Sequence, residues 1–239
     1  MVELEVDDGL AVITVDRPHA RNAIGPATMD ELEKAIADAE GALALVITGG
    51  GDRAFISGGD LKELAAIRTE TEAIAMSLRM RAICDQLSAF PAPVIAALNG
   101  HALGGGAEVA VAADIRIAAD DVRIGFNQVT LAIMPAWGGA ERLARLVGPG
   151  RALLLAGAGT VLNAEQAHQI GLVEMVVPRT TFAQQWRAIA RSLAIPSAVA
   201  IKRVTAGTVS ALEAAQAFAR LWIADEHWEA AERMMNRGR

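Results

Sequence analysis

The apolar and polar positions of this 239-residue chain follow two periods, one typical of strands and the other of helices. Near the start, residues 4–6 and 10–15 are rich in apolar side chains and flank Asp7-Asp8-Gly9, which predicts a β-hairpin. Continuous apolar runs at residues 43–48 and 94–98 indicate buried strands. The first half of the chain is therefore expected to supply a β-sheet.

Helical spacing appears between and after these strands. A helix is predicted to begin at Pro26, because proline is tolerated in a first turn. Residues 61–67 and 73–87 also have helical periodicity. Further short strands are expected at residues 114–118, 123–126 and 172–177. The pattern predicts an α/β fold, with a core of ββα units over residues 1–180 and a helical section over residues 181–239.

Composition narrows the class of protein. The net charge is −6 and no tyrosine is present, which argues against a basic, base-stacking surface for nucleic acid. The longest apolar runs are too short for a membrane span. Cys84 is the only cysteine and the four histidines are scattered, so neither an internal disulfide nor a metal site is expected. A cytoplasmic location follows as the default.

Two glycine-rich segments, at residues 54–60 and 99–106, carry the clearest chemical signal. Each follows an apolar strand and leads into a helical pattern. Glycine permits close approach of the backbone to a ligand, and the first turn of a helix has N–H groups without intrahelical acceptors. Two such turns facing each other are able to direct two N–H groups at one oxygen, which is an oxyanion hole.

Two side chains near these turns are candidates for acid–base chemistry. Glu108 lies in an otherwise apolar first turn of the predicted helix, where burial would raise its pKa toward the range useful for proton transfer. A helix-terminus charge is the equally weighted alternative. Gln128 is able to orient water or donate to a carbonyl, although local sequence slightly favours a surface amide.

Ser57 raises a different possibility, because a serine on a sharp turn after a strand resembles the nucleophile of a hydrolase. Phe55 occupies the first glycine position of the G-x-S-x-G pattern, so the pattern fails. A triad of Ser57 with His101 and an aspartate stays open as the less favoured interpretation. Among the basic residues near the glycine turns, Arg17, Arg21 and Lys62 are candidates to contact a phosphate.

Taken together, these segments resemble the enoyl-CoA hydratase/isomerase superfamily, also called the crotonase family, over nearly the whole chain. The most specific match is Asn-Gly-His-Ala-Leu-Gly-Gly-Gly-Ala-Glu at residues 99–108, together with its spacing to Gly58-Gly59-Asp60-Leu61. The resemblance implies a crotonase-like spiral of ββα units. It also implies that residues 181–239 form a section that contacts neighbouring chains in a homotrimer or a dimer of trimers.

The resemblance assigns roles to particular residues. It implies that the backbone N–H groups of Gly59 and Gly105 hold the thioester carbonyl of an acyl-CoA and stabilise its enolate. It places Glu108 and Gln128 at the two catalytic positions. The residues implied to line the path of the coenzyme A or the acyl group are Arg17, Ala20, Ser57, Gly59, Asp60, Leu61, Lys62 and Gly105, and Trp222 falls where an aromatic residue often lies near the CoA.

One departure from the family pattern affects the expected reaction. Hydratases of this family use two glutamates, whereas the second position here is Gln128. The resemblance implies an enoyl-CoA hydratase of fatty-acid β-oxidation, with Glu108 as the acid/base and no cofactor beyond the CoA of the substrate. The alternatives are another crotonase reaction, such as isomerisation, decarboxylation or carbon–carbon cleavage, and an acyl-CoA-binding protein with weak catalysis.

Overall fold

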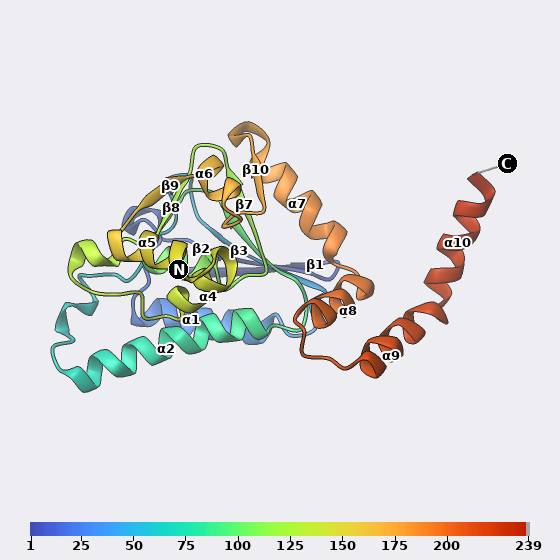
Figure 1. The fold of residues 1–239 in the computed structure, drawn as a ribbon, viewed down its shortest axis with the longest axis horizontal. Helices are drawn as coiled ribbons and strands as arrows, with labels where there is room; N and C mark the ends of the chain where they lie inside the picture. Colours follow the sequence, from blue (N-terminus) through green and yellow to red (C-terminus); the bar gives the residue numbers. More distant parts are fainter. Residues whose placement is uncertain (238–239) are drawn as a thin grey trace.

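The computed structural model describes residues 1–237, and two β-sheets form the body of the protein (Figure 1). The larger sheet has the strand order β1-β2-β3-β5-β7-β10, and the smaller has the order β4-β6-β8-β9. The strands of the larger sheet are Val2–Asp7, Leu10–Val15, Ala44–Gly49, Val94–Leu98, Ile115–Ala119 and Met175–Val177. Those of the smaller sheet are Ala54–Ile56, His101–Leu103, Arg123–Gly125 and Val161–Asn163.

Successive strands alternate between the two sheets. β3, β5 and β7 are parallel neighbours in the larger sheet, and each is followed by β4, β6 or β8 in the smaller one. A helical segment then leads to the next pair, which gives a repeating ββα unit: α2 (Glu70–Ala89), α3 (Gly105–Ala110) and η3 (Gln128–Leu131) with α4 (Gly139–Val147). This arrangement confirms the predicted α/β spiral, and the N-terminal hairpin is also present as β1 and β2.

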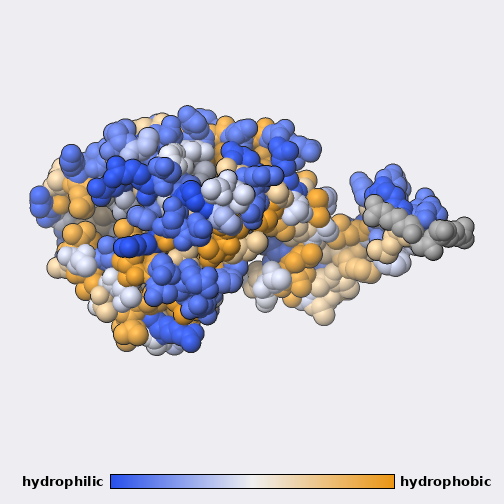
Figure 2. Space-filling view, turned by 90° about the horizontal axis from the view of Figure 1, so that it is seen from above, coloured by the Kyte–Doolittle hydropathy of each residue, from blue (hydrophilic) through white to orange (hydrophobic). Residues whose placement is uncertain are grey.

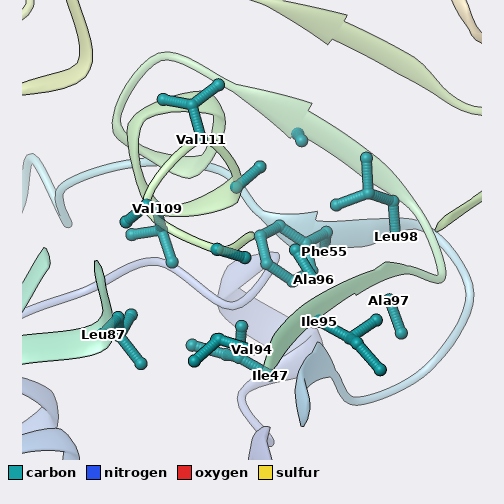
Figure 3. Close-up of a cluster of buried hydrophobic side chains, with 14 of the residues drawn as sticks. Ile47, Phe55, Leu87, Val94, Ile95, Ala96, Ala97, Leu98, Val109 and Val111 are labelled. Atoms are coloured by element: carbon teal, nitrogen blue, oxygen red, sulfur yellow. The ribbon is translucent and has the colours of Figure 1, made fainter. Parts of the chain in front are cut away.

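Helices cover the larger sheet. The helix predicted from Pro26 is α1 (Pro26–Asp38), which packs against β1, β2 and α2, while α7 (Phe182–Leu193) packs against β3 and β7. Figure 3 shows part of the apolar core between the layers, where Ile47, Phe55 and Val94 have no exposed surface. The other short elements are η1 (Pro18–Ala20), η2 (Leu64–Ala66), α5 (Pro149–Ala158), α6 (Ala164–Gln169) and η4 (Arg179–Thr181).

The C-terminal section is helical, but it is not one unit. α7 buries Phe182, Trp186 and Ala190 against the body, so the expected division after residue 180 does not separate it from the core. Beyond α8 (Pro196–Thr205), α9 (Ala211–Trp222) and α10 (Asp225–Arg237) extend away from the body as an arm (Figure 1). Hydrophobic surface continues from the body onto this arm (Figure 2). The last two residues of the expected section lie outside the described part.

Local differences from the predicted elements occur at the glycine turns. The helix expected at residues 61–67 is only the short 3₁₀ segment η2. Part of each predicted turn is instead a strand, since β4 and β6 pair in the smaller sheet. Strands of three residues leave little periodicity in a sequence, and here long-range pairing decides their conformation.

Arg116 joins the larger sheet to the segment before β10. Its side chain is fully buried, donates to the carbonyl oxygens of Leu172 and Ala113 (both 2.8 Å), and forms an ion pair with Glu174. We expect Arg116→Met to lower the free energy of unfolding by about 3–5 kcal/mol, because it leaves buried acceptors without partners. Denaturant unfolding measures this, with the exposed Arg123→Met as the control. A loss below about 1 kcal/mol, the typical effect of an ordinary mutation, would contradict this role.

The described residues 1–237 contain neither a helix suited to span a membrane nor a cluster of side chains suited to bind a metal ion. None of their helices combines the length and the apolar character needed to cross a membrane. Their His, Cys, Asp and Glu side chains form no group of three or more that could hold a metal ion.

Candidate active site

A cavity of about 470 Å³ opens where the two glycine turns meet. β4 and β6 are parallel neighbours, with Ala54 opposite His101, so the turns that follow them lie side by side. A Cβ atom built on Gly58 would stand 3.2 Å from the amide nitrogen of Gly105. The rest of the wall is largely apolar and includes Leu64, Ile67, Met76, Leu131, Ile133 and Met134.

Gly59 and Gly105 both line this cavity. Gly105 is the first residue of α3, so its N–H has no acceptor within the helix. Gly59 lies opposite Ile24, but the two hydrogen bonds there use Gly58 O and Asp60 N. Within residues 1–237, neither N–H donates to another residue, so both remain available to a ligand oxygen.

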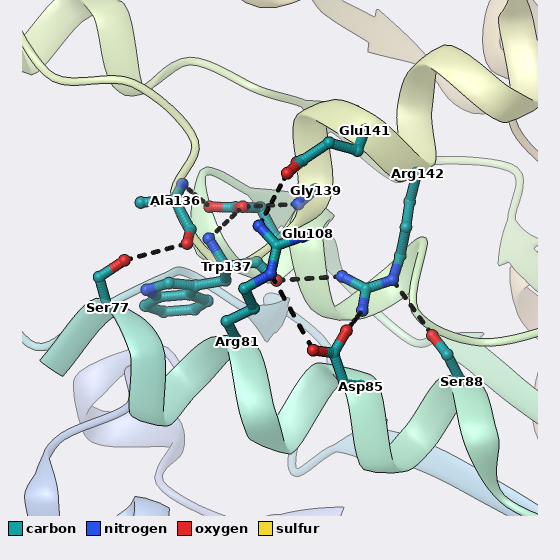
Figure 4. Close-up of polar contacts among 10 residues, drawn as sticks. All are labelled: Ser77, Arg81, Asp85, Ser88, Glu108, Ala136, Trp137, Gly139, Glu141 and Arg142. Carbon is teal, nitrogen blue, oxygen red and sulfur yellow. Dashed lines mark hydrogen bonds and ion pairs between the residues drawn. The ribbon is translucent and has the colours of Figure 1, made fainter. Parts of the chain in front are cut away.

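Glu108 lies one turn further along α3, and only 2% of its surface is exposed. Its Oε2 accepts hydrogen bonds from the N–H groups of Trp137 (2.7 Å) and Gly139 (2.9 Å), and Oε1 accepts one from Ala136 (3.3 Å), as Figure 4 shows. Burial raises the pKa of Glu108 above its usual 4.5, although these donors and the amide of Gln128 act in the opposite direction. The result is a fixed, buried carboxyl group at the cavity wall.

Residues 136–139, whose N–H groups donate to Glu108, are in turn fixed by side chains from α2 and α4 (Figure 4). Arg142 donates to Trp137 O (3.0 Å) and to Ser88 Oγ (3.1 Å), and it forms an ion pair with Asp85. From α2, Ser77 Oγ donates to Ala136 O at 3.0 Å. These contacts fix the backbone N–H groups of residues 136–139 around the carboxylate.

Close packing explains several of the glycines in this segment. A Cβ on Gly139 would lie 2.3 Å from Cγ of Glu108, and a Cβ on Gly105 would lie 2.1 Å from the ring of Trp137. Gly138 has a φ of +85°, which side chains rarely adopt. Nothing in the sequence indicated that the ring of Trp137 would form the wall opposite Gly105.

Gln128 begins η3 and is 7% exposed, so it is not the surface amide that the local sequence favoured. Its Nε2 donates to Glu108 Oε1 at 2.8 Å, although the two residues are 20 positions apart. Its Oε1 is buried and has no hydrogen-bond partner among the described residues. The structure therefore places both candidate acid–base residues side by side at the cavity.

The residues expected along the CoA path divide into two groups. Ser57 and Leu61 line the cavity together with the two glycines, whereas Ala20, Asp60 and Lys62 do not. Arg17 is also absent from the wall, because its buried guanidinium contacts Glu63 (2.6 Å), Asp60 (3.2 Å) and Ala23 O (2.6 Å). Arg17 is therefore committed to structural contacts. Of the basic residues considered, Arg21 lines the cavity instead.

The structure does not assemble Ser57, His101 and an aspartate into the catalytic triad that a hydrolase requires. Ser57 and His101 both line an adjoining cavity of about 350 Å³, but no hydrogen bond joins them within residues 1–237. The Nδ1 atom of His101 instead accepts from the N–H of Arg123 at 3.1 Å. The nearby Asp121 is paired with Arg179. Ser57 thus lacks both a base and an orienting acid.

Comparison with known proteins identifies the class to which this fold and cavity belong. The model of the enoyl-CoA hydratase/isomerase family matches residues 5–230, so the chain belongs to that family. It is similar to the short-chain-enoyl-CoA hydratase of Clostridium acetobutylicum, with 37% identity over 204 residues, 84% of this chain and 78% of the relative.

Two further relatives agree with this assignment. The crotonyl-CoA hydratase of Syntrophomonas wolfei is 41% identical over 177 residues, which are 73% of this chain and 68% of the relative. The crystal structure of enoyl-CoA hydratase from Bacillus anthracis has a TM-score of 0.88 and 30% identity, and the match covers 99% of this chain and 96% of that one.

Proposed function

We propose that this protein adds water to the double bond of 2-enoyl-CoA thioesters. The observation that carries this proposal is the position of a buried carboxyl group, Glu108, beside two unpaired N–H groups, those of Gly59 and Gly105. The N–H pair suits a thioester oxygen that gains negative charge, and the carboxyl group suits proton transfer. The surrounding apolar wall suits an acyl chain.

In the proposed reaction, Glu108 takes a proton from a water molecule whose oxygen bonds to the β-carbon of the substrate. The electrons of the double bond shift toward the thioester, and Gly59 and Gly105 stabilise the resulting enolate oxygen. Glu108 then returns the proton to the α-carbon. One water is consumed and one 3-hydroxyacyl-CoA is formed, with no cofactor beyond the CoA of the substrate.

Gln128 orients the water in this proposal and carries no proton, because an amide does not ionise near neutral pH. Glu108 therefore performs both proton transfers alone. An active site with Gln128 in place of the second glutamate is also compatible with the other crotonase reactions, namely isomerisation, decarboxylation and carbon–carbon cleavage. It is compatible as well with a protein that binds acyl-CoA with little turnover.

For the CoA path, we propose that Ser57, Leu61 and Arg21 contact the substrate directly, since they line the cavity. Asp60 and Lys62 lie on the segment that enters η2, and their Oδ1 and N–H atoms are hydrogen-bonded at 3.1 Å. Arg17 supports the segment of Asp60 and Glu63 through its buried contacts, and the N–H of Ala20 donates to Arg17 O at 2.9 Å.

The proposal is tested by incubating the purified protein with crotonyl-CoA, a 3-enoyl-CoA, and a malonyl-type thioester, with product identification by mass spectrometry. Formation of 3-hydroxybutyryl-CoA from crotonyl-CoA supports hydration. Turnover of only the 3-enoyl thioester would instead indicate isomerisation, and turnover of only the malonyl-type thioester would indicate decarboxylation. Tight binding of all three thioesters without any product would indicate that the protein binds acyl-CoA but does not catalyse a reaction on it.

The pH dependence of hydration should follow the ionisation of Glu108. Its carboxylate form accepts the proton from water, so kcat/KM is expected to fall as pH decreases through its raised pKa, above 4.5. Gln128→Glu places a second carboxyl group within hydrogen-bond distance, where like charges favour retention of a proton. We expect the acid limb of the variant to move to higher pH. An unchanged limb would contradict the contact between positions 108 and 128.

We further propose a homotrimer or a dimer of trimers, held in part by the arm. Support comes from its exposed apolar residues: Leu212, Phe218, Trp222, Ile223 and Trp228. Trp222 packs in an aromatic cluster with Phe218, His227 and Trp228, away from the body of its own chain.

We also infer a cytoplasmic location and a role in β-oxidation. Burial raises the pKa of the lone thiol, Cys84, to about 12, which suits a structural residue.

A further inference from the structure

The indole ring of Trp137 lies across the two glycines at the base of the cavity. A Cβ atom built on Gly105 would stand 2.1–2.8 Å from Cζ3, Cη2 and Cε3 of the ring, and one built on Gly59 would stand 3.8 Å from Cζ2. The backbone N–H of Trp137 also donates to Glu108 Oε2 at 2.7 Å. The ring is therefore fixed relative to both glycines and to the carboxyl group.

The ring nitrogen of Trp137 carries a hydrogen-bond donor without an acceptor. Only 6% of this residue is exposed, and it lines the cavity. Within residues 1–237, no acceptor pairs with Nε1, and Figure 4 shows the indole without a polar contact to the residues drawn around it. Unlike Arg17 Nε and Gln128 Oε1, however, Nε1 is not sealed from solvent. The donor is thus accessible to a ligand in the cavity that Trp137 borders.

The wall between α2 and residues 131–137 offers little other hydrogen bonding. Apart from Ser77 and Trp137, its side chains are apolar: Ala73, Met76, Leu131, Ile133, Met134 and Ala136. Ser77 donates its hydroxyl hydrogen to Ala136 O at 3.0 Å, so it has only lone pairs left to offer. Among the described residues, the indole N–H of Trp137 is therefore the one side-chain donor that this wall presents.

We propose that the indole N–H of Trp137 recognises a ketone oxygen on the acyl chain, so that the site favours acyl-CoA thioesters that carry such an oxygen beyond the β-carbon. This inference rests on the proposed function, which places the thioester oxygen at Gly59 and Gly105 and the reacting carbons beside Glu108. Nε1 lies two bonds past Cζ2, the ring atom nearest Gly59, and so it faces a more distant part of the chain.

The apolar wall decides which kind of oxygen suits this donor. A carboxylate at this position loses its hydration, and one neutral donor does not compensate for that loss. A ketone oxygen is neutral and accepts a single hydrogen bond well, while the rest of its chain contacts apolar side chains. The structure therefore favours an uncharged acceptor.

Selectivity follows from comparison with an unsubstituted chain. Such a chain displaces solvent from Nε1 and brings no acceptor, whereas a ketone oxygen restores the hydrogen bond. A net neutral hydrogen bond corresponds to about a three- to tenfold difference in affinity.

The test is calorimetric titration with hexanoyl-CoA, 4-oxohexanoyl-CoA and 5-oxohexanoyl-CoA, which have no double bond to hydrate. For the wild type, at least one oxo thioester should bind about three- to tenfold more tightly than hexanoyl-CoA. Trp137→Phe keeps an aromatic ring and removes the N–H, so this ratio should fall to about one. Trp186→Phe is the matched control, because Trp186 is buried on α7 and does not line the cavity, and it should keep the wild-type ratio.

A second measurement needs no variant. Of the four tryptophans in the chain, only Trp137 lines the cavity. In spectra of protein labelled with ¹⁵N, one indole N–H resonance should therefore lie further downfield in the complex with the preferred oxo thioester than in the complex with hexanoyl-CoA.

The outcomes separate this inference from the proposed function. A preference lost in Trp137→Phe and kept in Trp186→Phe supports the inference, as does the downfield indole resonance. Equal binding of all three thioesters by the wild type overturns it and leaves the acyl-CoA site intact, and so does a preference that survives in Trp137→Phe. Identical indole spectra in the two complexes also overturn it. If hexanoyl-CoA and both oxo thioesters fail to bind, the acyl-CoA site itself is wrong, and the inference falls with it.

Discussion

Replacement of Glu108 by glutamine should reduce the rate of crotonyl-CoA hydration by about 10²–10⁴-fold, the usual contribution of a positioned acid/base. Most hydrogen bonds at this position survive the change. The glutamine oxygen accepts from Trp137 and Gly139 in place of Oε2, and Gln128 is able to rotate its amide toward the new donor. The loss should therefore appear in kcat, with the folded structure retained.

Steady-state kinetics and thermal unfolding of the same preparation separate these effects. Glu40→Gln is the matched control, since Glu40 is exposed and lies at the end of α1, away from the cavity. It should keep the wild-type rate. Hydration by Glu108→Gln at more than about one-tenth of the wild-type rate would show that another group transfers the proton.

Substitution of Gly105 by alanine should cost about 10²–10³-fold in kcat, comparable to the loss of one oxyanion-hole donor. The added Cβ would stand 2.1–2.8 Å from three atoms of the Trp137 ring. Either the ring moves, and with it the N–H that holds Glu108, or the first turn of α3 moves. In the first case Glu108 loses a donor that fixes its carboxylate, and in the second the Gly105 N–H loses its alignment with Gly59.

The control for this variant is Gly150→Ala in α5, where a Cβ would meet nothing within 4 Å. A double variant, Gly105→Ala with Trp137→Ala, tests the stated cause. It removes the ring but keeps the backbone N–H of residue 137, so part of the lost activity should return. Near wild-type kcat in Gly105→Ala alone would contradict the position assigned to the Gly105 N–H.

The sequence predicted those parts of the site that depend on backbone chemistry and local order. The two glycine turns follow consecutive ββα strands, so parallel pairing of β4 with β6 is enough to bring Gly59 and Gly105 to one cavity. The position of Glu108 in the first turn of α3 follows from the same motif. The hairpin, α1 and the long α2 were also predicted, because their hydrophobic periods are long or clearly bounded.

Features that depend on tertiary contacts were not accessible from the sequence. A basic residue near the glycine turns suggests a phosphate contact, yet Arg17 is buried by Asp60 and Glu63, which come from a segment far along the chain. Likewise, nothing local to Gln128 distinguishes a surface amide from one that faces Glu108. The packing of α7 on the sheets also depends on partners, β3 and β7, that lie more than sixty positions earlier.

The central claim is that Glu108 and the N–H groups of Gly59 and Gly105 together form and stabilise an enolate. Incubation of the protein with butyryl-CoA in D₂O tests it most directly, because this thioester has no double bond to hydrate. Uptake of deuterium at the α-carbon, followed by mass spectrometry, then reports enolate formation alone. We predict uptake with the wild type and none above background with Glu108→Gln. No uptake with the wild type, or equal uptake with the variant, would contradict the claim.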